Sequence, residues 1–85
     1  MNISKFEQRV LHLLAQGGAI RYRRADNGRV IEPTCLTRDG YGFAGFDLHI
    51  LGKLKRKKLI KSTGGNPYRI SRNGLACVRA QLNNR

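Results

Sequence analysis

Acidic side chains are scarce in this sequence, and none follows Asp47. The 85 residues include 17 Lys and Arg but only 5 Asp and Glu, so the net charge is +12 at pH 7. Residues 53–85 hold ten basic groups and no carboxylate side chain, whereas residues 1–52 hold seven basic groups and all five acids. Because such a segment attracts anions, its candidate partners are nucleic acid, an acidic protein surface and an anionic membrane surface. The alternative is a solvated face that only aids solubility, although such faces usually mix both signs of charge.

Long apolar runs and cysteine pairs are also missing. No stretch approaches the roughly 18–20 apolar residues that span a bilayer, and residues 1–16 carry charges within their apolar pattern, unlike a signal peptide. We therefore predict a cytoplasmic protein without a membrane-spanning segment. Of the three candidate partners, we do not expect the membrane. Cys35 and Cys77 could form only one bridge, which a cytosolic protein does not need. A chain of 85 residues is expected to form one domain around a thin core, without a deep substrate cavity.

Catalytic and metal-binding patterns are absent as well. His12 and His49 stand alone, the two cysteines lie 42 positions apart, and the carboxylates fall at predicted caps, turns and strand surfaces. The pair Gly64–Gly65 lacks the strand–loop–helix frame of a phosphate-binding loop. We therefore predict no enzymatic activity, no cofactor, no metal and no small-molecule substrate.

Capping residues and apolar periodicity predict three helices. Ser4 and Glu7 have the capping-box spacing before a helix over 5–16. Asp47 is the expected N-cap of a helix reaching about Lys57, and Ser71 the expected N-cap of a helix over 72–82. Residues 83–85 are expected to fray.

Turn signals predict two hairpins between these helices. The Asn27–Gly28 pair should join strands at 19–25 and 29–36, with Pro33 forcing an edge strand that ends early or bulges. A second hairpin is expected from strands at 59–62 and 68–70. Aromatic residues at 41–46 are interpreted first as core anchors and second as an exposed partner-binding patch. The order helix–hairpin–helix–hairpin–helix predicts a small α+β domain over residues 1–85, resembling a winged helix.

The second helix is predicted to carry the binding surface. Its apolar residues fall on one half of a helical wheel and its basic residues on the opposite half, so the helix is amphipathic. The charge continues through the second hairpin into the third helix. The predicted binding residues are His49, Lys53, Arg56, Lys57, Lys58, Lys61, Arg69 and Arg72. Lysine-rich surfaces suit phosphate contacts better than base recognition, yet the same surface could dock on an acidic protein.

Five stretches of the sequence resemble the YjhX-like toxin family. They are LKRKKLIKS at 54–62, GNPYRIS at 65–71, VRAQL at 78–82, MNISKFEQ at 1–8 and CLTRDGY at 35–41. The resemblance implies a non-enzymatic toxin of a bacterial toxin–antitoxin pair that inhibits DNA topoisomerase I by protein contact. It also implies an acetyltransferase-like antitoxin. DNA is a further candidate partner, which follows from the basic charge and not from the resemblance. The resemblance assigns no residue, so the binding residues rest on charge and periodicity alone.

Two functional hypotheses follow. The leading one is a toxin that binds topoisomerase I or its complex with DNA. The alternative is a winged-helix regulator that binds duplex DNA through the same basic helix and hairpin.

Overall fold

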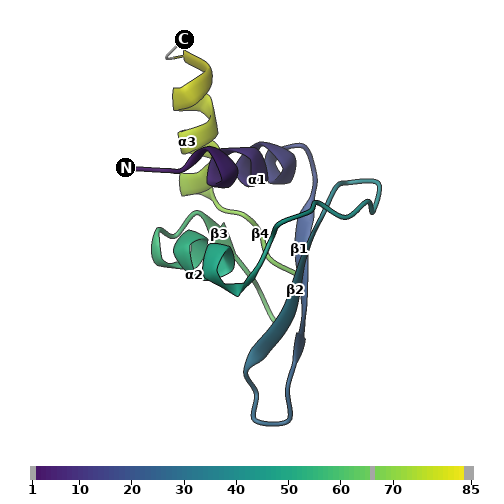
Figure 1. The fold of residues 1–85 in the computed structure, drawn as a ribbon. Helices are drawn as coiled ribbons and strands as arrows, with labels where there is room; N and C mark the ends of the chain where they lie inside the picture. Colours follow the sequence, from purple (N-terminus) through teal and green to yellow (C-terminus); the bar gives the residue numbers. More distant parts are fainter. Residues whose placement is uncertain (1, 66, 84–85) are drawn as a thin grey trace.

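A computed structural model describes residues 2–65 and 67–83 of the chain. The elements follow in the order α1, β1, β2, α2, β3, β4, α3 (Figure 1). Their bounds are Lys5–Ala15 for α1, Ala19–Arg24 for β1, Val30–Leu36 for β2, Leu48–Arg56 for α2, Ile60–Lys61 for β3, Arg69–Ile70 for β4 and Arg72–Asn83 for α3. The predicted α+β class is confirmed, and each helix lies within about a turn of its predicted bounds. Of the predicted frayed end, Asn83 belongs to α3, and the last two residues lie outside the described part.

Helix α1 begins with the predicted capping box. The Glu7 amide donates to the Ser4 hydroxyl at 3.1 Å, and the Ser4 amide donates to Glu7 Oε1, also at 3.1 Å. This pairing satisfies two of the amides that a helix leaves without partners at its N-terminus.

The hairpin β1–β2 is antiparallel and extends away from the helices (Figure 1). Its register advances from Arg21 opposite Thr34 to Arg23 opposite Ile31, so β2 contains one extra residue. The bulge includes Glu32, whose φ of 49° lies in the left-handed region. Pro33 is the cause, because it has no amide to donate. Of the two predicted outcomes for this strand, the bulge is the one observed.

The short hairpin β3–β4 is joined to the rest of the molecule on three sides. Tyr68 and Ile20 of β1 exchange two backbone hydrogen bonds of 2.9 Å. The Ser71 hydroxyl donates to the Lys58 carbonyl at 2.7 Å, and the Ser71 amide donates to the Leu59 carbonyl at 2.9 Å. Gly74 of α3 is pressed so closely against the Leu59 carbonyl that a Cβ atom would not fit. These contacts hold β3–β4 between α2, β1 and α3.

One apolar core lies between the helices and the inner faces of the two sheets. Its buried members are Val10, Leu11, Leu14, Ile20, Cys35, Leu51, Leu54, Leu59, Ile60, Tyr68 and Val78. The rings of Tyr22 in β1 and Tyr68 beside β4 pack together at the margin of this core, with their centroids 5.3 Å apart.

The aromatic segment at 41–46 combines both interpretations offered for it. Phe43 and Phe46 pack against the core, and the Phe43 ring lies 5.5 Å from that of Phe6. Tyr41, by contrast, is 73% exposed. Leu48, expected on the apolar half of its helix, is also exposed, because it stands in the first turn of α2, ahead of the part that packs on the core. No helix in the described part of the chain is both long and apolar enough to cross a bilayer.

Candidate interaction surface

A buried carboxylate organises one edge of α2. Glu7 of α1 is only 1% exposed, and the Lys57 ammonium donates to its Oε1 at 3.1 Å and to its Oε2 at 2.9 Å. Lys57 also donates to the Asn2 carbonyl at 2.8 Å, and the Lys53 ammonium lies 4.0 Å from Glu7 Oε1. Two lysines from successive turns of α2 thus share one acid of α1.

This arrangement corrects one expectation. The helical wheel places Lys53, Arg56 and Lys57 together on the solvent side, but only Arg56 of the three is fully exposed. Lys53 and Lys57 turn toward α1 because Glu7, which is buried there, needs compensation of its charge. Their contribution to a docking surface is therefore smaller than the periodicity suggests.

The protonation of Glu7 reflects two opposed influences. Burial by itself raises the pKa of this carboxyl, but the hydrogen bonds from Lys57 and Ser4 and the charge of Lys57 together lower the pKa below its ordinary value of 4.5. The group is therefore ionised at neutral pH and forms a charge-assisted link between α1 and α2.

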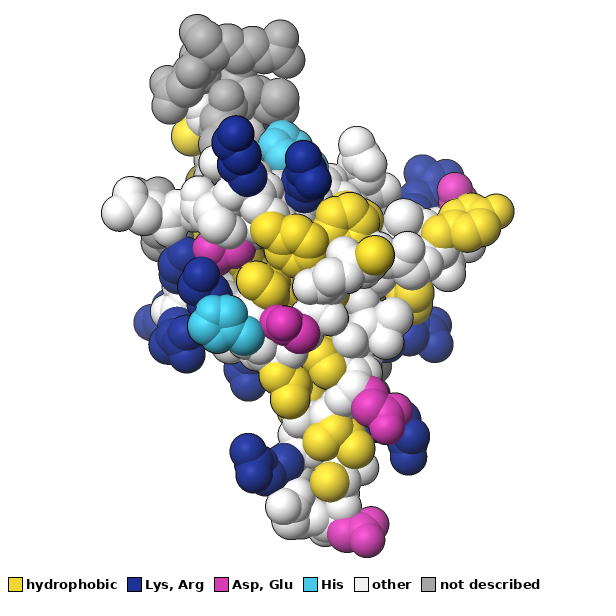
Figure 2. Space-filling model, in the orientation of Figure 1, with side chains coloured by type: hydrophobic (Ala, Val, Ile, Leu, Met, Phe, Trp, Pro, Cys, Tyr) yellow, Lys and Arg dark blue, Asp and Glu magenta, His cyan; other side chains and the backbone are white. Residues whose placement is uncertain are grey.

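The other predicted cations, Arg56, Lys58, Lys61, Arg69 and Arg72, are exposed, as is Lys55 of α2, which was not among the predicted binding residues. We define the basic surface as these exposed residues: Lys55, Arg56, Lys58, Lys61, Arg69 and Arg72. In Figure 2, Lys and Arg side chains gather over α2, whereas hydrophobic side chains gather between α1 and α2. The Lys55 ammonium lies 5.6 Å from the ring centroid of Tyr68, beside β4. In the described part of the chain, none of the six forms an ion pair.

Lys58 is held in an unusual backbone conformation. Its φ of 58° is in the left-handed region, where glycine is the preferred residue. The Lys58 amide donates to the Lys55 carbonyl at 3.0 Å and the Leu59 amide to the Leu54 carbonyl at 3.0 Å. These bonds end α2 in a Schellman-like turn, whose left-handed position is usually occupied by glycine.

Two cations face each other across β3–β4. Lys61 is the register partner of Arg69, and Ile60 is the partner of Ile70. Because side chains alternate along a strand, the isoleucines face inward and the two cations face outward. With Thr63 and Pro67 they line a hollow of about 220 Å³. The Arg69 guanidinium makes one long hydrogen bond of 3.4 Å to the Gly17 carbonyl.

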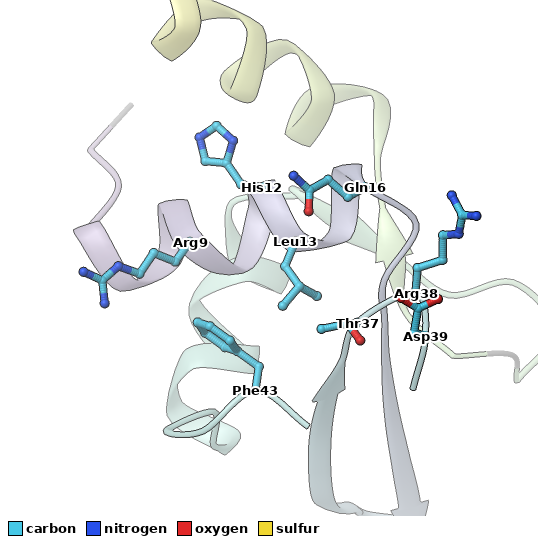
Figure 3. A pocket seen from close by; sticks show the side chains of 8 residues that line it. All are labelled: Arg9, His12, Leu13, Gln16, Thr37, Arg38, Asp39 and Phe43. Carbon is cyan, nitrogen blue, oxygen red and sulfur yellow. The ribbon is translucent and has the colours of Figure 1, made fainter. Parts of the chain in front are cut away.

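A larger hollow of about 620 Å³ lies between α1 and the turn that follows β2. In Figure 3, Leu13 and Phe43 point toward one another across it, while Arg9 and Arg38 extend away on opposite sides. His12, Gln16, Thr37 and Asp39 complete the lining. This α1 hollow has an apolar centre with cations at its margins, so it could hold an apolar side chain flanked by acidic groups.

The two histidines and the two cysteines differ in their exposure. His49, a predicted binding residue, is exposed near the start of α2, and His12 is half-buried. Burial raises the pKa of the Cys35 thiol to about 11, which keeps it protonated and unreactive. Cys77 is a half-buried free thiol. Among the described residues, no three His, Cys, Asp or Glu come together as metal ligands.

Sequence reasoning missed the second role of Glu7. It assigned this residue only to the helix cap, which is correct but incomplete. The signal was present, because Glu7 precedes Val10, Leu11 and Leu14 by three, four and seven positions and so lies on the buried stripe of α1. A carboxylate on an apolar stripe requires a cation from a neighbouring element.

Comparisons with known proteins agree with the resemblance. A family model described as "Putative toxin of bacterial toxin-antitoxin pair" matches residues 1–85. UPF0386 proteins of Beijerinckia indica and of Ruegeria sp. strain TM1040 are 58% and 59% identical over 85 residues, with both chains fully covered. One from Caulobacter vibrioides is 58% identical over the whole of this chain and 93% of its own length. No solved structure matches the chain.

The match to the family model extends over the entire sequence, and these relatives share more than half of its residues. The chain therefore belongs to the YjhX toxin family, whose members are described as toxins of bacterial toxin–antitoxin pairs.

Proposed function

We propose that this protein is a non-enzymatic toxin that inhibits DNA topoisomerase I in the cytoplasm by binding the enzyme or its complex with DNA. The basic surface is the docking surface in this proposal, and an acetyltransferase-like antitoxin is the neutralising partner. In winged-helix terms, α2 serves as the presenting helix and β3–β4 as the wing. The toxin class comes from the family, and the identity of the target comes from the resemblance.

The observation that carries the proposal is an exposed set of cations that have no counter-ion among the described residues. Charged surfaces that serve only for solubility usually mix positive and negative side chains. The six residues of the basic surface all follow Asp47, which is the last acidic residue in the sequence. A positive potential of this kind accelerates the encounter with an anionic partner. A topoisomerase bound to DNA offers such a partner in its nucleic acid.

The backbone at Lys58 supports the same conclusion. A left-handed conformation costs a residue with a side chain about 1 kcal/mol relative to glycine. The chain nevertheless has a lysine at this position, and it is one of the six residues of the basic surface. The Schellman-like turn requires the left-handed backbone but not a lysine, and strained residues often lie where a side chain serves binding.

Expression in bacteria tests the proposal. The wild-type chain should arrest growth and change the supercoiling of a reporter plasmid. A triple variant with Arg56→Gln, Lys58→Gln and Lys61→Gln should lose most of both effects. The matched control, with Lys5→Gln, Arg21→Gln and Arg29→Gln, removes the same number of charges from exposed positions on α1, β1 and the β1–β2 turn and should retain them. Normal growth and unchanged supercoiling with the wild-type chain would contradict the proposal.

A single substitution separates loss of binding from loss of folding. Lys58→Gly removes one charge and also relieves the left-handed backbone, so it should raise the free energy of unfolding by about 1 kcal/mol while weakening toxicity. Affinity capture of topoisomerase I from lysate, with and without nuclease, then shows whether the enzyme alone or its DNA complex is bound. Tight, sequence-selective duplex binding without topoisomerase I would favour a DNA-binding regulator instead.

A further inference from the structure

We propose that the hollow between Lys61 and Arg69 binds a phosphate group of a nucleic-acid backbone. This inference rests on the proposed function, because it takes the basic surface as the docking surface and names the part of the target that one region of it meets. It adds a defined site and a ligand chemistry that the family description does not contain.

The geometry of the hairpin sets the two cations side by side. Lys61 and Arg69 are register partners on adjacent antiparallel strands and project from the same face. Like charges directly opposite each other on a sheet are unfavourable. A small anion between the two side chains would remove that repulsion and bind both.

Another pair of cations in this molecule shares a counter-ion. Lys53 and Lys57 share the carboxylate of Glu7, which lies 4.0 Å and 2.9 Å from their ammonium groups. In the described part of the chain, Lys61 and Arg69 form no ion pair, and only a long hydrogen bond to the Gly17 carbonyl restrains the guanidinium. Since no acid of the described residues pairs with them, we expect the anion that completes this second pair to come from a partner.

The lining of the hollow suits a phosphate. The volume of about 220 Å³ accommodates a phosphodiester together with water, and Thr63 offers a hydroxyl beside the two cations. A phosphodiester has two unesterified oxygens, which can be shared between an ammonium and a guanidinium. Arginine and lysine are the usual phosphate-binding side chains, the former through its planar fork and the latter as a point charge.

The surroundings favour nucleic acid over a membrane as the source of the phosphate. Further cations follow at Lys55, Arg56 and Lys58, so successive phosphates along a strand would each meet a positive group. Binding to a lipid surface normally adds exposed apolar anchors. The large hydrophobic residues exposed in the described part of the chain are Tyr41 and Leu48, and neither lines this hollow.

Fluorescence anisotropy with a labelled oligothymidylate of about twelve nucleotides tests the inference, because a homopolymer reports backbone binding. Lys61→Gln or Arg69→Gln should each weaken binding roughly three- to tenfold and reduce the magnitude of the salt slope by about 0.7, the value per phosphate contact on single strands. Lys5→Gln, an exposed control on α1, should leave the affinity near that of the wild type.

A second variant supplies the missing anion internally. Thr63→Glu places a carboxylate beside Lys61 and Arg69, as Glu7 lies beside Lys53 and Lys57, and should weaken oligonucleotide binding more than either neutral substitution. In the wild-type protein, inorganic phosphate should shift the NMR signals of Lys61 and Thr63 before those of α1.

Three outcomes would overturn the inference. These are unchanged oligonucleotide affinity in all hollow variants, a loss no larger than that of Lys5→Gln, or stronger binding to a polyglutamate peptide or to anionic vesicles than to the oligonucleotide. Failure of the proposed function is a separate result. A wild-type protein that binds oligothymidylate through this hollow but leaves growth and supercoiling unchanged supports the phosphate site and rejects the toxin mechanism.

Discussion

The two pairs of cations in this molecule differ in what lies between them. On one edge of α2, Lys53 and Lys57 converge on the buried carboxylate of Glu7. On the outer face of β3–β4, Lys61 and Arg69 stand opposite each other without an acid in the described part of the chain. The first pair is internal structure and links α1 to α2. The second is surface charge that, among the described residues, is held only by the long hydrogen bond from Arg69 to the Gly17 carbonyl, so in our proposal it is available to a partner.

The difference arises from where the acids lie in the sequence. All five carboxylate side chains precede residue 48, so a cation of the C-terminal half gains a counter-ion only where an N-terminal element packs against it. Helix α1 brings Glu7 to α2. The hairpin β3–β4 contacts β1 through Tyr68 and Ile20, and that contact contains no acid. Topology therefore decides which lysines are structural and which are free to bind.

The largest effect is expected from removing the charge of Lys57, the main partner of Glu7. Lys57→Met should lower the free energy of unfolding by about 2–3 kcal/mol at pH 7, because it leaves the buried Glu7 without its main partner. The loss falls somewhat below that of a fully buried pair, since Lys57 is 26% exposed and Lys53 lies nearby. Urea denaturation measures the change.

The matched control for this substitution is Lys55→Met. Lys55 is exposed on the same helix and has no acidic partner in the part of the structure described, so the change should stay within about 0.5 kcal/mol. Adding Glu7→Leu to Lys57→Met should recover most of the lost stability, because an apolar pair can replace a buried ion pair. Equal losses for Lys55→Met and Lys57→Met would show that Glu7 does not depend on Lys57.

Acid provides a second test of the contact between Glu7 and Lys57. The pKa of Glu7 is lower in the folded protein than its ordinary value of 4.5, so its ionisation stabilises the fold. That stability is fully present above about pH 4.5 and is lost as the pH falls through the folded pKa. Glu7→Gln should flatten the decline in stability below pH 4.5, measured by urea denaturation at a series of pH values.

Glu32→Gln serves as the control for the acid experiment. Glu32 pairs with Arg23 at 3.0 Å on the exposed hairpin, where ion pairs contribute little. This variant should keep the acid-dependent decline of the wild type. An identical pH profile for wild type and Glu7→Gln would show that Glu7 does not contribute to the loss of stability in acid.

Much of this fold follows from local sequence signals. Ser4 with Glu7, Asp47 and Ser71 mark the helix starts because their side chains satisfy amides within the next turn. Asn27–Gly28 marks the long hairpin, and Pro33 its bulge. Each signal operates over a few residues, so the bounds could be predicted without tertiary information.

The candidate site was predictable only in part. The exposure of Arg56, Lys61 and Arg69 follows from periodicity and charge. The inward turn of Lys53 and Lys57 depends on a residue about fifty positions away in the sequence, and helical periodicity contains no information about that partner. The hollow between Lys61 and Arg69 likewise depends on strand register, which a two-residue strand does not specify from its own sequence.

The smallest expected effect has the opposite sign. Lys61→Gln should raise the free energy of unfolding by about 0.2–0.5 kcal/mol in low salt, because it relieves repulsion from Arg69 across the hairpin. High salt should abolish the gain, since both side chains are exposed and screened by ions. Lys57→Met, by contrast, should remain destabilising at every salt concentration because Glu7 is buried. If Lys61→Gln instead lowers stability in low salt, Lys61 already has a favourable partner within the chain, and the contrast between the two cation pairs no longer holds.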